Sequence, residues 1–490
     1  MEETPDAMDS TLQRDTGFHP VASARERINI AESGSMKPPF LMAADSQKES
    51  SKHAIRSIAG ACMLYTVLAF PAVFSSIGLY IAVYMRQVGG DRSVEYYSVS
   101  LLFLLSIIFQ SIGAMFTSPL VAAMGERKLS LLGCLGVTLC IMGSAHYLHN
   151  YYAFMLLYSV LGGTLSGLAM SVPVDAVLKL NSKRRGLSCG ILHGVVGMAL
   201  TFMGPLYVSY INGKPPRLTW NGSINQLQSG KAGNNIMKHL MDKAVLQRAK
   251  SVILYTAVFY LILTIFGLRW TFANADDSEE AITEKHSSEY EPFVAKGESR
   301  KSENDPRRNV GWWEYISLWL LSLLAWQALL YIHAHWRNHA VNVYKASATD
   351  MVKAELVVRG SSLIGRIAWG MAIDTYGWKV TWTSFSIATL IITIAMKEVY
   401  HNSFVLYVMW VAMVYFTYSG VFCIVPLAAH QIFGSQSFIQ VFSTLSTSRA
   451  IAGSIAFFFS ITMRSYEHWI LGYISILSVS SLLVVTLIDE

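Results

Sequence analysis

Long apolar stretches alternate with short polar ones along most of the chain, starting near residue 57. An α-helix of about 20 residues crosses the roughly 30 Å hydrocarbon core of a bilayer. About twelve stretches reach that length, and they lie near residues 57–84, 97–121, 129–148, 151–180, 186–211, 251–272, 312–336, 351–374, 378–397, 403–430, 437–463 and 467–488. The pattern predicts an all-α membrane protein with about twelve transmembrane helices in two six-helix bundles.

The polar tracts predict where the domains begin and end. Residues 1–55 carry Pro, Ser, Lys and Glu without an apolar period, which is typical of a disordered tail. Residues 273–310 are also polar and join the predicted bundles at 56–272 and 311–490. This linker is acidic first and basic later, so docking on lipid or on the cytosolic face is the alternative to a solvated tether.

Composition narrows the class of protein. Hydrophobic residues make up 53% of the 490 residues and charged residues only 14%, which excludes an ordinary soluble protein of this size. All the cysteines lie inside apolar stretches, so none is placed to link an exposed loop, and they are expected to be small core residues. They are Cys62, Cys134, Cys140, Cys189 and Cys423.

Lys and Arg in the short loops predict the orientation, because these residues gather on the cytosolic side of a membrane. They fall on one side, which places both termini in the cytosol, although the longer outer loop 212–250 is also basic. The net charge of +6 then reflects topology, and no nucleic-acid partner is predicted. No signal-peptide type of apolar segment precedes the first span, so the first helix is expected to direct insertion.

The two predicted bundles are related by an internal repeat. Gly113 and Gly125 recur as Gly365 and Gly377, with an offset of 252 residues. Within one residue, the same offset relates Gly167 and Pro173 to Gly420 and Pro426. A repeat that keeps its topology predicts two bundles about an axis along the membrane normal, with a substrate held between them near the midplane.

Arg366 and Arg449 are permanent cations inside apolar stretches. A guanidinium cannot lose its proton, and near the bilayer centre it costs roughly 3 kcal/mol or more, so it persists only beside a cavity, a counter-charge or a substrate. The alternative for Arg366 is an arginine held by helix-end carbonyls. Arg359 has Glu355 four residues before it and is expected to form an ion pair instead.

Other polar residues in the spans are weaker candidates. His193 is predicted as a proton or substrate contact, or else as a histidine satisfied by a neighbouring backbone or hydroxyl group. Tyr65 and Gln327 could donate hydrogen bonds to an anion from the first and seventh spans. His335 and His339 share a helix face and suggest a metal site in a membrane enzyme, but no second ligand group completes it, so no metal is predicted.

A loop pattern of Gly, Asp, Gly and a basic residue follows the eighth span, and its residues are Gly370, Asp374, Gly377 and Lys379. After the second span the counterpart has Gly113, Gly125 and Arg127, with Ala122 at the acidic position. The pattern resembles the signature loop of the major facilitator superfamily. The resemblance implies close helix approach and a tight turn at the glycines and a cation at a helix end. Ala122 implies an incomplete cytosolic charge latch on the N-terminal side.

The fifth span opens KRRGLSCGILHGVVGMA and the eighth contains IGRIAWG, similar to the branch of oxalate:formate antiporters and monocarboxylate transporters. The resemblance covers nearly all of residues 56–488. It implies that Arg366 and Arg449 bind a carboxylate, Arg449 standing where a lysine is usual. The Asp and Lys of proton-linked monocarboxylate transporters are replaced by Ser362 and Ala72, so proton symport by that route is not expected.

By the repeat spacing, Arg366 corresponds to Ala114 and Arg449 to Val196 or Gly197, so the predicted cations belong to the C-terminal half only. The leading hypothesis is a monomeric secondary carrier of small organic anions that works by alternating access and exchange. It is not an enzyme and needs no cofactor. The alternatives are a carrier of amino acids, nucleosides or drugs, a proton-linked monocarboxylate symporter, and a membrane receptor or enzyme that transports nothing.

Overall fold

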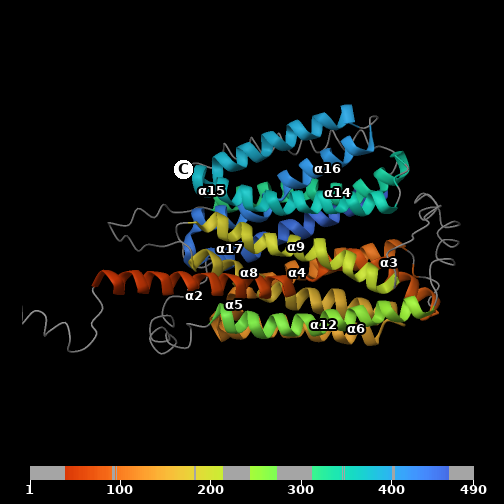
Figure 1. Cartoon of the computed structure of the whole chain (residues 1–490), viewed down its shortest axis with the longest axis horizontal. Helices are drawn as coiled ribbons and strands as arrows, with labels where there is room; N and C mark the ends of the chain where they lie inside the picture. Colours follow the sequence, from red (N-terminus) through yellow and green to blue (C-terminus); the bar gives the residue numbers. More distant parts are fainter. Residues whose placement is uncertain are drawn as a thin grey trace, which may run out of the picture. The chain divides into compact units, whose positions relative to one another are not determined.

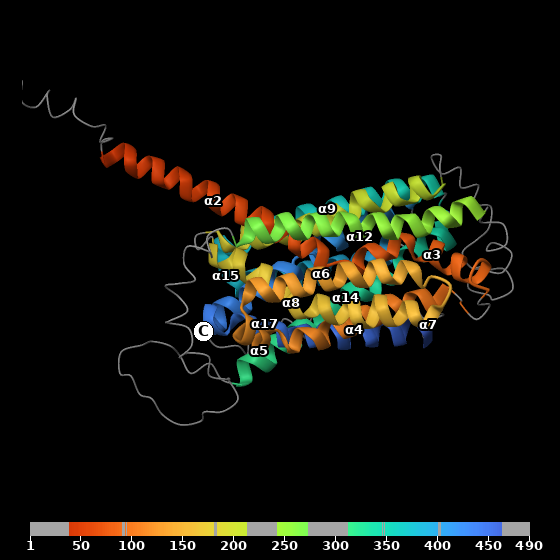
Figure 2. The same ribbon diagram turned by 90° about the horizontal axis from the view of Figure 1, so that it is seen from below.

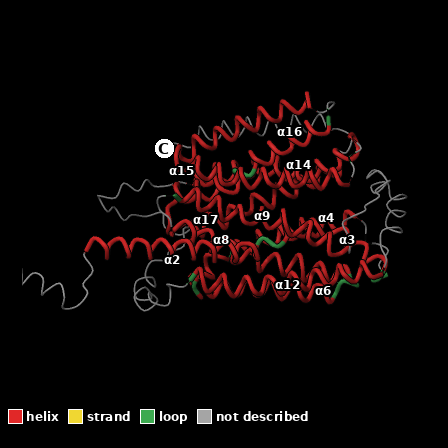
Figure 3. Tube along the Cα trace, in the orientation of Figure 1, coloured by secondary structure: helices red, strands yellow, loops and turns green. Residues whose placement is uncertain are grey.

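The computed structural model describes residues 39–90, 94, 96–180, 184–212, 243–272, 312–344, 346, 348–399 and 403–462. The chain divides into two compact units, Met1–His53 and Ala54–Glu490, and the second holds nearly all of the described residues. Every regular element among them is a helix. Figure 3 shows these helices, with short stretches of loop between some of them. The all-α prediction is therefore confirmed.

The helices run side by side along one axis of the second unit (Figures 1 and 2). Those of the N-terminal half are α2 (Pro39–Leu68), α3 (Pro71–Gln87), α4 (Tyr96–Met115), α5 (Thr117–Met124), α6 (Glu126–His146), α7 (Tyr151–Phe154), the π-helix η1 (Met155–Leu161), α8 (Gly162–Leu180), α9 (Arg185–Asn212) and α12 (Lys243–Thr271). Those of the C-terminal half are α14 (Trp312–Tyr344), α15 (Ala348–Val399), α16 (Phe404–Tyr418) and α17 (Val421–Thr462).

The predicted spans fall on these helices, except for 467–488, which lies outside the described residues. By length and composition alone, six of the described helices could cross a membrane, or seven if the bent pair α4 and α5 is one span. The number is lower than predicted partly because α15 and α17 are each two helices joined at a sharp bend. Of the predicted tail, residues 1–38 lie outside the described residues, whereas 39–55 belong to the helix α2, so a disordered tail is not what this part shows. The predicted linker 273–310 also lies outside the described residues, and the domain boundaries stay predictions.

The bends occur at glycines that adopt a conformation closed to other residues. Gly377 within α15 has φ 77° and ψ 168°, and Gly125 between α5 and α6 has φ 82° and ψ 159°. A Cβ at either position would meet no neighbouring residue, but residues with a side chain rarely adopt this positive φ, so glycine avoids local backbone strain there. Gly377 and Gly125 are repeat counterparts, so the sequence repeat reappears as one backbone turn made twice.

The repeat also fixes how helices pack inside each half. A Cβ atom on Gly113 would lie 2.1 Å from the carbonyl oxygen of Thr164, and one on Gly365 would lie 2.3 Å from that of Phe416. Thr164 and Phe416 are themselves 252 residues apart. The contact of α4 with η1 and α8 is thus repeated between α15 and α16. Small residues at these points let the backbones touch.

The two halves meet chiefly where α9 packs against α15 and where α4 packs against α17. Gly186 and Gly370 lie back to back, and a Cβ on Gly186 would lie 2.0 Å from the carbonyl oxygen of Gly370. At the second contact, the Ser111 hydroxyl donates to the carbonyl of Ser446 over 2.8 Å. Both predicted cations lie on the C-terminal helices of these contacts.

Candidate functional site

Arg366 projects from α15 toward α9 and is 7% exposed. Its Nη1 donates a hydrogen bond to the carbonyl of His193 on α9. Its guanidinium lies 4.3 Å from the ring centre of Phe422 on α17, in a cation–π contact. Its Nε is buried without a hydrogen-bond partner. Arg366 is therefore held by one neutral carbonyl and an aromatic face, which leaves part of its donor capacity unused.

The space for Arg366 comes from a glycine in the other half. A Cβ on Gly197 of α9 would lie 3.3 Å from Nη1 of Arg366, tighter than ordinary contact. Gly197 stands 252 residues before Arg449, which is the repeat spacing. The repeat counterpart of Arg449 in the N-terminal half is thus Gly197, and Gly197 makes room for Arg366. This explains why both cations can belong to the C-terminal half.

Arg449 lies on α17 and reaches the N-terminal half. Its Nη2 donates to Oε1 of Gln110 on α4, and its guanidinium lies 5.8 Å from the ring centre of Trp326 on α14. The side chain is partly exposed, whereas its Nε is buried and unpartnered. Arg366 and Arg449 therefore each make their strongest described contact with a neutral oxygen across the contact between the halves.

Gln110 was not predicted as a site residue. Its Nε2 donates to the Ser166 hydroxyl at 2.7 Å and to the carbonyl of Leu68 at 3.1 Å. Leu68 ends α2, and the last carbonyls of a helix lack partners within it, so they accept from side chains. These two bonds turn the amide oxygen of Gln110 toward Arg449. The signal in the sequence was a single amide in the apolar run LLFLLSIIFQ.

Neither arginine forms an ion pair within the described part of the chain. Other cations do: Arg359 pairs with Glu355, as predicted, and Lys179 pairs with Asp175 at 2.5 Å. A buried cation with no counter-charge is costly, because its lost hydration is not replaced. Arg366 and Arg449 therefore differ from Arg359 and Lys179, whose charges are each paired with a carboxylate.

The remaining candidates lie around these charges. The ring centroids of Tyr65 and His193 are 4.9 Å apart, in an edge-to-face contact. Nδ1 of His193 is 2.9 Å from the carbonyl oxygen of Cys189, which matches the alternative of a histidine satisfied by nearby backbone. Gln327 is buried on α14, next in sequence to Trp326. His335 and His339 also lie on α14, but their side chains are outside the described residues.

The second copy of the signature loop bonds the two halves through its carboxylate. The carboxylate of Asp374 accepts from the backbone N–H of Gly186 at 2.7 Å and of Leu187 at 2.9 Å. A carboxylate suits the N-terminus of α9, where N–H groups lack partners and the helix dipole is positive. In the other copy Ala122 is exposed and can make no such bond. The first copy of the loop, whose charge latch was predicted to be incomplete, thus has no carboxylate at the position of Ala122.

The basic residues of the two loops have different surroundings. Nζ of Lys379 lies 5.9 Å from the ring centre of Trp378, and Arg127 is exposed at the start of α6.

Sequence analysis also missed a buried charged residue. Asp175 of α8 is fully buried. Its partner Lys179 follows four residues later and also bonds Glu126 at 3.0 Å. The i, i+4 spacing of Asp175 and Lys179 was the available signal.

The sequence matches the Major Facilitator Superfamily over residues 58–457, and the chain belongs to this family. It is therefore a multi-pass membrane transporter rather than an enzyme, and the resemblance stated above is confirmed at the level of the family.

Two curated relatives come from Toxoplasma gondii. Apicoplast pyruvate carrier 2 is 21% identical over 503 residues, covering 82% of this chain and 76% of the relative. Apicoplast pyruvate carrier 1 is 21% identical over 355 residues, covering 68% of this chain and 63% of the relative. The chain thus spans less than two thirds of the second carrier.

Solved structures share the fold. The proton:xylose symporter XylE, bound to 6-bromo-6-deoxy-D-glucose, superposes with a TM-score of 0.61 at 13% identity, covering 89% of this chain and 95% of that one. A double-tryptophan mutant of XylE gives a TM-score of 0.61 at 14% identity, covering 90% and 95%. At this identity the likeness concerns the fold alone, and it confirms the predicted fold class.

Proposed function

We propose that this chain carries small organic anions, either mono- or dicarboxylates, by alternating access and in exchange for one another. The observation behind the proposal is that Arg366 and Arg449 both project into the contact between the halves and have no carboxylate partner among the described residues. Two cations without a counter-charge favour an anionic ligand. The names of the two pyruvate carriers agree with a carboxylate substrate.

The donor geometry suits a carboxylate. An arginine binds a carboxylate through two parallel N–H groups, and such charge-assisted bonds are roughly twice as strong as neutral ones. Arg366 and Arg449 now bond a carbonyl and an amide oxygen, and the Nε of each is unpartnered. A carboxylate would give both Nε atoms an acceptor and would supply the missing negative charge. Tyr65 packs against the ring of His193, whose carbonyl accepts from Arg366, and we expect it to add a hydroxyl donor.

Exchange follows from the same electrostatics. Alternating access requires the halves to move against each other around the bound substrate. An empty carrier would pass through its occluded state with two unneutralised cations, whereas a bound anion lowers that cost. Arg366 and Arg449 each contact the N-terminal half, so an anion that binds them would lie where the two halves meet. The loaded carrier is therefore expected to move faster than the empty one.

A substrate screen in proteoliposomes tests the proposal. The purified chain is loaded with unlabelled pyruvate, lactate, oxalate or formate, and uptake of the matching labelled anion is measured. Neutral and zwitterionic solutes, such as a nucleoside and an amino acid, serve as comparators. We expect saturable exchange of at least one carboxylate and none in the Arg366→Gln/Arg449→Gln double variant. Exchange of a comparator with no carboxylate transported would overturn the proposal.

A further inference from the structure

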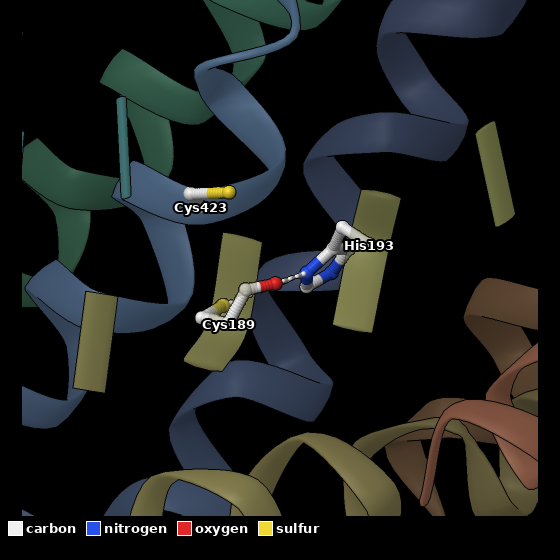
Figure 4. A group of neighbouring side chains, drawn as sticks. All are labelled: Cys189, His193 and Cys423. Carbon is white, nitrogen blue, oxygen red and sulfur yellow. Dashed lines mark hydrogen bonds between the residues drawn. The ribbon is translucent and has the colours of Figure 1, made fainter. Parts of the chain in front are cut away.

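A second group of side chains lies beside Arg366, where α9 meets α17. Cys189 and His193 lie on α9, and Cys423 lies on the facing part of α17 (Figure 4). One ligand atom from each residue, the two Sγ atoms and a ring nitrogen, falls within 4.8 Å of the others. All of these residues are buried, with exposed fractions of 0%, 2% and 0% in chain order. The group is built from both halves of the carrier.

We propose that Cys189, His193 and Cys423 form a binding site for a soft d10 metal cation, with Cu(I) the best match. Thiolate and imidazole ligands favour Cu(I) and Zn(II), whereas Mg²⁺ and Ca²⁺ need oxygen ligands. The group contains two sulfurs and one imidazole and no carboxylate. Cu(I) accepts two or three ligands, whereas zinc sites are almost always four-coordinate. This assignment depends on the ligands alone and not on the proposed transport.

The spacing of the ligands requires only small movements. Cys189 and His193 are four residues apart and share one face of α9, with Sγ 3.5 Å from Nδ1. Metal–ligand bonds to sulfur and nitrogen are about 2.0–2.3 Å long, so ligand atoms on one ion lie at most about 4.6 Å apart. The ligand atoms now lie within 4.8 Å of one another, so each must move by tenths of an ångström to about one ångström to bind one ion. Nδ1 would exchange its bond to the Cys189 carbonyl for the metal.

The charge balance favours a monovalent ion. Each thiol loses its proton to the buffer when it binds a metal. Two thiolates and one Cu(I) carry a net charge of −1, which the guanidinium of Arg366 offsets. Arg366 is adjacent, because its carbonyl accepts from the Cys423 thiol at 3.3 Å and its guanidinium covers Phe422. A divalent ion would leave an uncompensated positive charge in the same buried place, which is costly.

An ion bound here would hold the halves together. Cys189 and His193 move with the N-terminal half and Cys423 with the C-terminal half. Because alternating access separates facing helices, a metal shared between them opposes the motion. We therefore expect Cu(I) to slow exchange, a consequence that rests on the proposed function. The binding itself can be measured without any transported substrate.

Copper competition in detergent tests the site. The purified full-length protein is titrated anaerobically with Cu(I) bicinchoninate, and loss of the coloured complex reports metal transfer. We expect the parent to withdraw one more equivalent than the Cys189→Ala/Cys423→Ala variant. His193→Ala leaves both thiolate ligands in place and should keep this equivalent with weaker affinity than the parent. Cys134→Ala removes a buried cysteine outside the group and should behave as the parent.

Two further measurements complete the test. Metal-free melting temperatures verify that each variant is folded. Cu(I) should raise this temperature for the parent and for Cys134→Ala, by less for His193→Ala, and not for the Cys189→Ala/Cys423→Ala variant. Equal copper uptake by the parent and the Cys189→Ala/Cys423→Ala variant would overturn the proposal. Uptake of no copper, with a Cys189–Cys423 disulfide forming in air, would also overturn it and identify a redox pair. Slower exchange of Cu(I)-loaded parent, but not of Cys423→Ala, would add the predicted effect on transport.

Discussion

Arg449 of the C-terminal half donates a hydrogen bond to the side-chain oxygen of Gln110 in the N-terminal half. Gln110 is fixed from behind, since its amide nitrogen is bonded to Ser166 and to the carbonyl of Leu68. The arginine thus meets an oriented but neutral acceptor. A carboxylate is the stronger acceptor for a guanidinium, so a substrate anion could replace Gln110 as the partner.

The first prediction concerns the charge of Arg449. Arg449→Gln should lower carboxylate affinity by roughly 30- to 5,000-fold, because removing one partner of a buried charged contact costs about 2–5 kcal/mol. Arg449→Lys keeps the charge and should retain partial affinity. Binding is measured by the concentration dependence of exchange. Arg359→Gln is the matched control, since Arg359 already pairs with Glu355. Unchanged transport by Arg449→Gln would exclude a two-cation site.

The second prediction supplies the missing counter-charge from within the protein. Gln110→Glu places a carboxylate within hydrogen-bond reach of Arg449, where it would compete with the substrate. We expect KM for the carboxylate to rise at least about tenfold while the variant melts no lower than the parent. Gln110→Leu, which adds no charge, should leave KM closer to that of the parent. An equal rise in both variants would show that Gln110 acts through packing.

The third prediction tests the room that Gly197 leaves for Arg366. A methyl group on Gly197 would lie 3.3 Å from Nη1, so Gly197→Ala should displace the guanidinium and weaken anion binding by roughly tenfold. Gly194→Ala is the control, because its Cβ would meet the flexible tip of Leu363 at 3.0 Å. Comparable KM values for the two variants would show that the position of Arg366 is not set by Gly197.

The fourth prediction concerns the one-sided latch. Asp374→Ala removes both acceptors for the first N–H groups of α9 and should cost about 0.5–2 kcal/mol, as loss of a helix cap does. The melting temperature in detergent should fall accordingly. Tyr376→Ala lies in the same turn with its side chain exposed and should leave it unchanged. If Asp374→Ala melts with the parent, the two bonds add no net stability.

The sequence allowed the spans, the repeat and both intramembrane arginines to be predicted, because each can be recognised from a short stretch of sequence or a fixed spacing. A cation in an apolar run is visible without knowing its neighbours, and the paired glycines lie at a fixed spacing. Gln110 and the Cys189–Cys423 contact could not be predicted. Their importance depends on which helix faces which across the contact between the halves, and residues 339 apart in sequence, such as Arg449 and Gln110, show no local relation.

The last prediction concerns coupling. Ser362 and Ala72 stand where proton-linked relatives carry Asp and Lys, so no carboxylate there can take up a transported proton. The buried titratable groups to test within the described spans are His193, bonded through Nδ1 to the Cys189 carbonyl, Asp175, paired with Lys179, and His430 of α17. We therefore expect uptake to follow a trans-anion gradient.

Uptake of labelled carboxylate is compared in vesicles with and without internal counter-anion, and with and without an inward pH step. Counter-anion should accelerate uptake, and the pH step alone should not drive it into empty vesicles. Strong proton-driven uptake that survives His193→Ala, Asp175→Asn and His430→Ala would contradict both exchange and the inference from the missing acid. Proton-driven uptake abolished by one of these substitutions would instead identify that residue as the proton carrier.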